Sequence, residues 1–201
     1  MNHDGALRRW LDEAADVLRT VDAGAVARAV QLLTEVRARG GVIYTAGNGG
    51  SAATASHLAL DLQKAAGART ASLSDNVGLL TAWANDTSFD RVFAEQLQVL
   101  GAERDGVVVI SVSGSSPNVI ALLDVARQKG MASVGLLGRD GGRAAALVDV
   151  PVVVPSDDYG WVESAHVVLH HVLTYALRDS SLNAGSRVGQ GARVRRAIAD
   201  R

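Results

Sequence analysis

The chain has 201 residues, of which 48% are hydrophobic and 20% are charged, and its formal net charge is −1. This balance predicts one globular domain without a global charge for nucleic acid or a membrane surface, and the absence of cysteine excludes disulfides and thiolate chemistry. No secretory signal begins the chain and no apolar run reaches the length of a membrane span, so we expect a cytoplasmic protein.

Two amphipathic helices are predicted before the first strand. Over residues 6–21 and 25–39, apolar residues recur at helical spacing with charged residues on the opposite face. The pair Gly40-Gly41 ends the second helix. We expect residues 1–40 to form a two-helix arm that packs on the sheet or on another subunit.

Strands and helices then alternate. Apolar strand patterns occur at 42–45, 71–73, 107–110, 132–137 and 150–154, and helical patterns at 52–66, 76–84, 88–100, 119–126, 143–147 and 162–178. This alternation predicts an α/β fold in which a doubly wound, mostly parallel five-stranded sheet is flanked by helices on both faces. Residues 1–178 form a single domain on this reading, with the α/β core at 41–178.

The end of the chain has a different composition. Residues 179–201 are rich in serine, glycine and arginine and poor in apolar residues. We predict a flexible basic tail here in preference to a nucleic-acid-binding arm.

The stretch 107–118 is predicted to hold a phosphate group. Four β-branched residues in a row at 107–110 indicate a strand buried on both faces. A turn with Ser111, Ser113 and Ser116 follows, and Pro117 suits the first turn of the next helix. Backbone N–H groups, the positive end of the helix dipole and the hydroxyls would all face a bound anion.

A second glycine-rich loop follows the first strand, at 47–52. It lacks the G-x-G-x-x-G spacing of dinucleotide sites, and no Gly-Lys-Ser/Thr occurs in the chain. Because ligands of parallel sheets bind at the carboxyl ends of the strands, both loops should face one crevice. Hydroxyls and amides in these loops favour a small phosphorylated ligand, and the alternative is two ordinary βα turns.

Taken together, the segments 46–57 and 110–119 resemble the two signatures of the sugar isomerase (SIS) domain family, and most closely those of its phosphoheptose isomerase subfamily. The segments 84–86 and 138–142 and the helical arm also match. The resemblance implies an aldose–ketose isomerase that converts sedoheptulose 7-phosphate to D-glycero-D-manno-heptose 7-phosphate, or a related seven- or eight-carbon sugar phosphate, through an enediol(ate). It also implies a homotetramer with active sites at subunit interfaces.

The resemblance assigns substrate-binding positions. The phosphate ligands implied by it are Ser51, Ser111, Ser113 and Ser116, and the sugar-lining positions are Asn48, Gly49 and Asp86. The family usually has threonine where this chain has Val112, so one hydroxyl is missing. This departure is one reason why the identity of the sugar stays open.

His57 and Asp61 lie four residues apart on one predicted helix, so they share a face and can bind one metal or flank one substrate. The resemblance matches His57 to a histidine that ligates zinc in some members. It places Asp61 where the family has its catalytic glutamate, with a side chain one methylene shorter. An isomerase of this kind needs a base above C1 and C2 and an acid at the carbonyl oxygen.

The last helix supplies the remaining candidates. The resemblance places Glu163 at a position usually held by glutamine and His171 at the catalytic, metal-binding histidine. Helical spacing alone groups Glu163, His166 and His170, so whether His170 or His171 faces the site stays open, and packing in the core is the alternative for all three histidines.

We therefore expect Asp61 and His171 to be the catalytic pair, and His57, Asp61, Glu163 and His171 to hold a divalent metal, zinc by its ligand types. A non-catalytic SIS protein that binds a phosphosugar and a protein partner is the alternative. The retained Asp61, His57 and His171 favour catalysis over it. A phosphosugar sensor is disfavoured because no helix-turn-helix segment is present.

Overall fold

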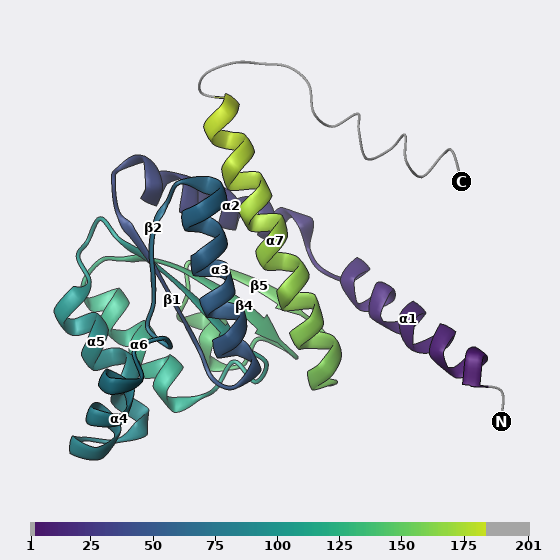
Figure 1. Cartoon of the computed structure of the whole chain (residues 1–201), viewed down its shortest axis with the longest axis horizontal. Coiled ribbons are helices and arrows are strands. Elements are labelled where there is room, and N and C mark those ends of the chain that lie inside the picture. The colour runs from purple at the N-terminus through teal and green to yellow at the C-terminus, as the bar shows by residue number, and fades with distance from the viewer. Residues whose placement is uncertain (1–2, 184–201) are drawn as a thin grey trace.

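Five parallel strands in the order β2-β1-β3-β4-β5 form the centre of the computed structural model, which describes residues 3–183 (Figure 1). The strands are β1 (Val42–Gly47), β2 (Arg69–Ser72), β3 (Gly106–Ser111), β4 (Ala132–Gly138) and β5 (Val150–Val154). All four pairings are parallel, so the predicted doubly wound α/β fold is confirmed. The strand order changes direction between β1 and β3, and such a switch point is where open sheets bind ligands.

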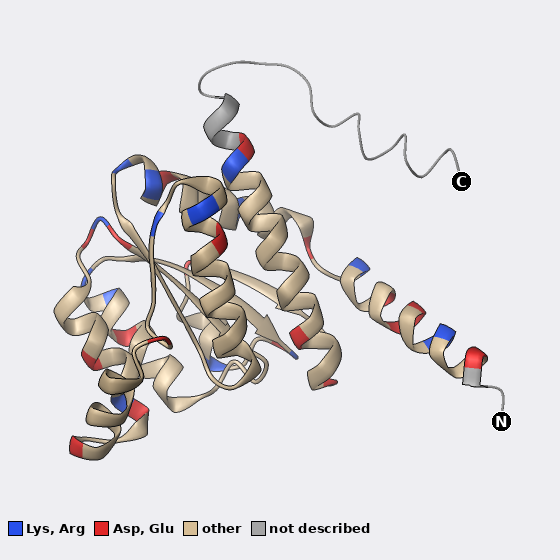
Figure 2. Ribbon diagram, viewed as in Figure 1, with Lys and Arg blue, Asp and Glu red and all other residues tan. Residues whose placement is uncertain are grey.

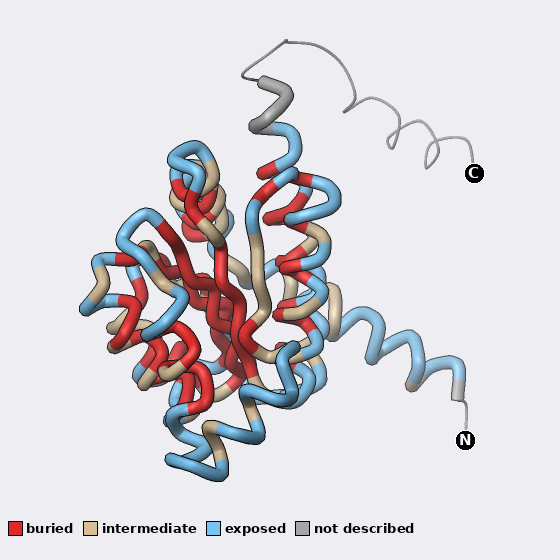
Figure 3. The backbone as a smooth tube through the Cα atoms, turned by 60° about the vertical axis from the view of Figure 1, so that its left-hand side comes forward, coloured by how far each residue is buried: buried red, intermediate tan, exposed pale blue. Residues whose placement is uncertain are grey.

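Helices cover both faces of the sheet. One face carries α2 (Ala23–Ala38), α3 (Gly50–Ala66) and α7 (Tyr159–Asn183). The other carries α4 (Val77–Asp86), α5 (Val92–Leu100), α6 (Pro117–Gln128) and the short 3₁₀ helices η1 (Phe89–Arg91) and η2 (Arg143–Ala146). Because helices cover both of its faces, the sheet is the buried centre of the molecule (Figure 3).

Strand β3 explains why the sheet is buried on both sides. Val108 and Ile110 belong to the core beneath α2, α3 and α7, whereas Val107 and Val109 belong to the core beneath α5 and α6. All four side chains are fully buried. Alternate residues of a strand point to opposite faces, so an uninterrupted apolar run is what a two-sided core requires.

The two N-terminal helices differ in their packing. Helix α2 packs on the sheet through Ala29, Leu33 and Val36. Helix α1 (His3–Arg19) projects away from the body of the molecule and touches the core only near its end (Figure 1). Trp10 and Leu11 are consequently 48% and 65% exposed.

Two boundaries differ from those expected. The helix predicted over 88–100 opens as the 3₁₀ turn η1, because Ser88 is extended and the Arg91 amide bonds to its carbonyl. Helix α7 passes residue 178 and ends at Asn183, since neither glycine nor proline occurs between 179 and 183 to stop it. Five residues assigned to the tail are therefore helical, and the rest of the predicted tail, 184–201, lies outside the described residues.

Among the described residues, no helix is long and apolar enough to cross a membrane. Lysine and arginine are interspersed with aspartate and glutamate over the described helices and loops, and they form no single band of one sign (Figure 2).

A buried carboxylate aligns the beginnings of the two central strands. Asp105 is 2% exposed. Its Oδ1 accepts a hydrogen bond from the Val42 amide at 2.8 Å, and its Oδ2 accepts one from the Ala102 amide at 2.9 Å. Bonds from amides to a charged acceptor are stronger than neutral ones. Asp105 thus ties β1 to the loop before β3, and the opposite ends of these strands carry the two glycine- and serine-rich loops.

Replacing Asp105 with alanine should lower the free energy of unfolding by about 1–3 kcal/mol, because the half-buried Val42 amide and the exposed Ala102 amide lose the buried carboxylate that accepts from both. Asp105→Asn keeps one acceptor oxygen and should lose less. Urea unfolding at neutral pH measures both. Equal stability of the wild-type protein and the alanine variant would contradict this role for Asp105.

Candidate active site

The two glycine- and serine-rich loops meet in one pocket of about 100 Å³ at the carboxyl ends of β1 and β3. Its lining residues are Asn48, Ser51, Ile110, Ser111, Val112, Ser113, Ser116, Tyr159 and Glu163. The predicted shared crevice is therefore present. We call it the serine pocket.

A pair of asparagines joins the loops. Asn48 donates to Asn118 Oδ1 at 2.8 Å, and Asn118 donates to Asn48 Oδ1 at the same distance. Asn118 is 2% exposed and lies in the first turn of α6. This reciprocal bond fixes the loop after β1 against the helix after β3, so the two halves of the pocket keep one spacing.

The helices that begin at the serine pocket have no side-chain cap. Helix α3 starts after Gly49 and α6 starts after Ser116, and neither residue caps its helix through a side chain. By contrast, Asp22 accepts from the Gly24 amide in α2, and Asn76 accepts from the Leu79 amide in α4. First-turn amides of α3 and α6 and the positive ends of their dipoles therefore remain available to an anion.

Gly114 shapes the serine turn. Its φ is +59°, and a Cβ at this position would collide with the Gly141 carbonyl oxygen. The Gly114 carbonyl accepts from the Ala144 amide at 2.8 Å, and Ser115 Oγ accepts from the Arg143 amide at 3.2 Å. The segment 138–142, identified from the sequence as part of a motif, thus supports the turn from behind.

Glu163 brings the only ionisable side chain among the residues that line the serine pocket, apart from the phenol of Tyr159. Its carboxylate rests on the bare Cα of Gly50, where an added Cβ would collide with it. Glu163 therefore lies at the start of α3, beside the phosphate-binding candidates.

A second group of polar side chains lies farther along the α3–α7 pair, and we call it the histidine cluster: His57, Asp61, His170 and His171. Asp61 Oδ2 is 3.4 Å from His57 Nε2, 3.4 Å from His170 Nε2 and 3.7 Å from His171 Nε2. One possible ligand atom from each residue lies within 4.8 Å of all the others. The arrangement can hold a metal ion.

Hydrogen bonding and burial keep two of these rings ready to act as ligands. His171 Nδ1 is 2.8 Å from the Val167 carbonyl oxygen, which can only accept, so Nδ1 carries the proton and Nε2 presents its lone pair. His170 is fully buried. Its pKa is lowered from 6.5 to about 4, first by burial and then by the neighbouring His171 and His57, while Asp61 opposes the shift. His170 is thus neutral at pH 7.

The structure assembles part of the predicted metal set. His57, Asp61 and His171 lie together, whereas Glu163 lies in the serine pocket and His170 occupies the fourth place in the cluster. Glu163 precedes His171 by eight residues, a rise of about 12 Å along a helix, which separates their side chains. Helical spacing from Glu163 had indicated His170 as a candidate, but which histidine faced the site could not be decided without the position of α3.

Asp86 is not brought to either group. It ends α4, is exposed, and accepts a hydrogen bond from the Asn85 side chain at 2.8 Å. Gly49 borders the serine pocket in sequence and has a φ of +55° that favours glycine.

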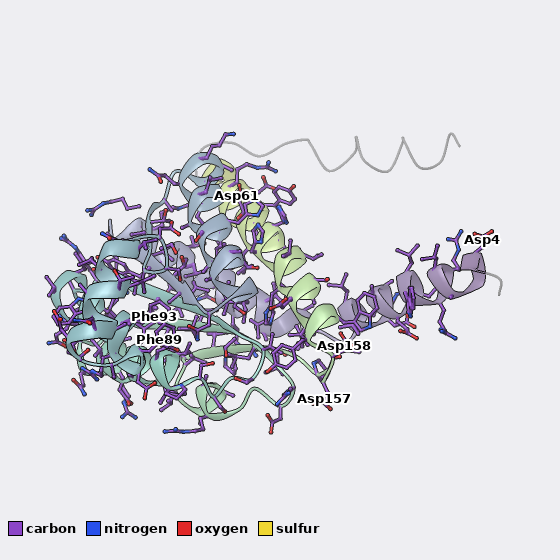
Figure 4. All side chains as sticks on the ribbon, turned by 60° about the horizontal axis from the view of Figure 1, so that its bottom comes forward. Asp4, Asp61, Phe89, Phe93, Asp157 and Asp158 are labelled. Atoms are coloured by element: carbon purple, nitrogen blue, oxygen red, sulfur yellow. The ribbon has the colours of Figure 1, made fainter. Side chains whose placement is uncertain are left out.

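The serine pocket and the histidine cluster lie at opposite ends of α3. Ser51 and Asp61 are ten residues apart on that helix, about 15 Å along its axis. Figure 4 shows Asp61 well separated from Asp157 and Asp158, which directly precede α7 at the end where Tyr159 and Glu163 line the serine pocket.

Comparisons with known proteins agree with this geometry. A model of the SIS domain family matches residues 9–138. The phosphoheptose isomerase of Trichlorobacter lovleyi is 39% identical over 153 residues, 74% of this chain and 78% of that protein, and the one of Helicobacter pylori strain P12 is 36% identical over 176 residues, 85% and 88%. The solved structure of the phosphoheptose isomerase from Neisseria gonorrhoeae has a TM-score of 0.82 and 31% identity, covering 90% of this chain and 100% of that one.

His166 makes the stability of the fold depend on pH. It is fully buried, and burial lowers its pKa from 6.5 to about 4, with the Leu137 backbone opposing the shift only in part. The unfolded chain binds this proton below pH 6.5, whereas the folded chain does not until about pH 4. The contribution of neutral His166 to the free energy of unfolding is therefore complete above pH 6.5. It is lost as the pH falls towards 4, by about 3 kcal/mol in all.

A His166→Gln variant should accordingly show a shallower loss of unfolding free energy between pH 6.5 and 4 than the wild-type protein. Urea unfolding with EDTA at three pH values in this range measures the slope. His170 is present in both proteins, so its contribution cancels in the comparison. Parallel slopes would show that His166 does not carry this dependence.

Proposed function

The chain belongs to the SIS domain family, and on that premise we propose that it is an aldose–ketose isomerase that interconverts sedoheptulose 7-phosphate and D-glycero-D-manno-heptose 7-phosphate. The observation that carries the proposal is the pairing of a pocket rich in uncharged hydrogen-bond donors at the start of α3 with a carboxylate–imidazole pair near its end. Relatives that match about three quarters of the chain or more are named phosphoheptose isomerase.

The phosphate would bind in the serine pocket. Ser51, Ser111, Ser113 and Ser116 offer hydroxyls there, and the uncapped starts of α3 and α6 offer amides. These donors hold an anion by hydrogen bonds and helix dipoles without a lysine or arginine. Glu163 adds a negative charge to the rim of the pocket. Its carboxylate would accept hydrogen bonds from sugar hydroxyls and would repel phosphate oxygens.

The proton transfer would use Asp61 and His171, whose Oδ2 and Nε2 atoms are 3.7 Å apart. Asp61, as base, would take a proton from one of the two carbons and return it to the other. His171, held by its Nδ1 bond to Val167, would donate from Nε2 to the carbonyl oxygen. With a divalent metal such as zinc bound by His57, Asp61 and His171, Nε2 of His171 would be a ligand and not a proton donor, and the metal would supply the stabilisation of negative charge on the oxygens of the substrate.

We also propose that copies of this chain assemble as a homotetramer with active sites at subunit interfaces. Trp10 and Leu11 on α1 and Val168, Val172 and Tyr175 on α7 expose apolar surface that one copy leaves uncovered. The separation of about 15 Å along α3 between Ser51 and Asp61 supports this arrangement, because another copy can bring an acid–base pair closer to the phosphate.

The activity is tested by incubation of the protein with sedoheptulose 7-phosphate in deuterated water, with and without zinc. We expect deuterium at C1 and formation of the aldose. Asp61→Asn and His171→Ala should each lower the rate by about 100-fold or more, because each removes one proton-transfer group. Mass spectrometry and proton NMR of the sugar follow both readouts.

Asp90→Asn is the matched control for Asp61→Asn, because Asp90 is an exposed aspartate in η1 away from both groups, and its rate should equal that of the wild-type protein. Binding of seven- and eight-carbon sugar phosphates without any exchange or product would refute the isomerase and favour a phosphosugar-binding protein.

A further inference from the structure

We propose that His170 is the fourth protein ligand of the metal, so that one chain supplies three histidines and one aspartate to the site, and that Glu163 of the same chain is not a ligand. The inference rests on the proposed function only in that a divalent metal binds at the histidine cluster.

The spacing of the Asp61 carboxylate oxygen from three imidazole nitrogens fits four-coordinate zinc, and all four donor atoms lie within 4.8 Å of one another. Ligand atoms 2.0–2.1 Å from a tetrahedral zinc ion lie about 3.3 Å from one another. Asp61 Oδ2 lies 3.4, 3.4 and 3.7 Å from the Nε2 atoms of His57, His170 and His171. The carboxylate oxygen is thus already at coordination spacing from three imidazole nitrogens.

The ring nitrogens of His170 have no hydrogen-bond partner among the described residues that would compete with a metal. The side chain is fully buried, and neither ring nitrogen makes a hydrogen bond of normal geometry with any described residue. Its Nε2 faces Asp61 Oδ2 at 3.4 Å, which is longer than a normal N–H···O bond. Buried polar atoms without partners are rare because they are costly, and coordination of a metal would satisfy Nε2.

The rings of His57, His170 and His171 lie close together beside Asp61. Their centroids are 3.9 Å apart, and those of His57 and His170 are 4.4 Å apart. His171 is oriented by the Val167 carbonyl, the outer contact that metal-bound histidines commonly make. Three imidazoles around one carboxylate form a more complete ligand set than the two histidines and two carboxylates expected from the sequence.

Glu163 is placed elsewhere by the helix that carries it. About 12 Å of helix separates it from His171. Its carboxylate lies over Gly50 at the other end of α3, where it lines the serine pocket. The negative charge at this position therefore acts on the ligand in that pocket.

The consequence is that the metal fastens α3 to α7. Each helix supplies two donors, His57 and Asp61 from α3 and His170 and His171 from α7. Four protein ligands hold the ion firmly, and zinc can expand to five-coordinate, so a substrate oxygen can still reach it. Zinc should consequently raise the thermal stability of the full-length chain, and Co²⁺ in its place should give the intense visible absorption of four-coordinate cobalt.

The test is a Zn²⁺ competition titration of the metal-free full-length protein against a chromophoric chelator, without any sugar present. His170→Ala should weaken Zn²⁺ binding by at least about tenfold, because it removes a ligand. Glu163→Gln, the matched control on the same helix, should bind Zn²⁺ as the wild-type protein does. Circular dichroism checks that the variants fold, and His170→Asn, which keeps a polar side chain, is the second variant.

Nitrogen NMR of the histidine rings in the wild-type protein gives an answer that needs no variant. The chain has five histidines, and Zn²⁺ should shift the ring signals of three of them, His57, His170 and His171, and leave His166 in place. Shifts of only two rings, a loss of affinity in Glu163→Gln equal to that in His170→Ala, or no Zn²⁺ binding at all would overturn the proposal. Absence of isomerase activity with an intact three-histidine signature would refute the proposed function alone.

Discussion

The packing of α3 against α7 is the contact on which both polar groups depend. Each helix is amphipathic and buries leucines and alanines against the same face of the sheet, among them Leu58, Leu62, Leu169 and Leu173. Because the helices run side by side over their length, the start of each contributes to the serine pocket and the later turns of each contribute to the histidine cluster (Figure 1). This apolar interface thus fixes the distances between the polar side chains that the two helices carry.

The serine pocket follows from a different constraint, the reversal of strand order between β1 and β3. The loops after these two strands diverge to opposite faces, and the crevice between them receives the starts of α3 and α6. Both helices lack side-chain caps, while α2 and α4 have them. First-turn amides, which donate to a side-chain cap in α2 and α4, are here left for a ligand, and the asparagine pair Asn48–Asn118 keeps the two loops together.

The histidine cluster also shows how one shorter side chain changes a site. Asp61 reaches less far than a glutamate from the same backbone position, yet it lies within 3.7 Å of three imidazole nitrogens because His170 and His171 are consecutive on α7. The fourth member of the cluster is a buried imidazole, and Glu163 of the last helix lies at the serine pocket. A site with the same general chemistry is reached through different residues.

The sequence by itself determined the alternation of strands and helices, the two-sided burial of β3, the pairing of His57 with Asp61 and the convergence of both loops, because each depends on local periodicity or on a rule of parallel sheets. It did not determine that both adjacent histidines, His170 and His171, face Asp61, that Glu163 lies over Gly50, or that Asp86 stays apart from both groups. Those positions depend on how α3 and α7 cross and where α4 docks, and these are set by side chains that meet from distant parts of the chain. Only the tertiary structure decided them.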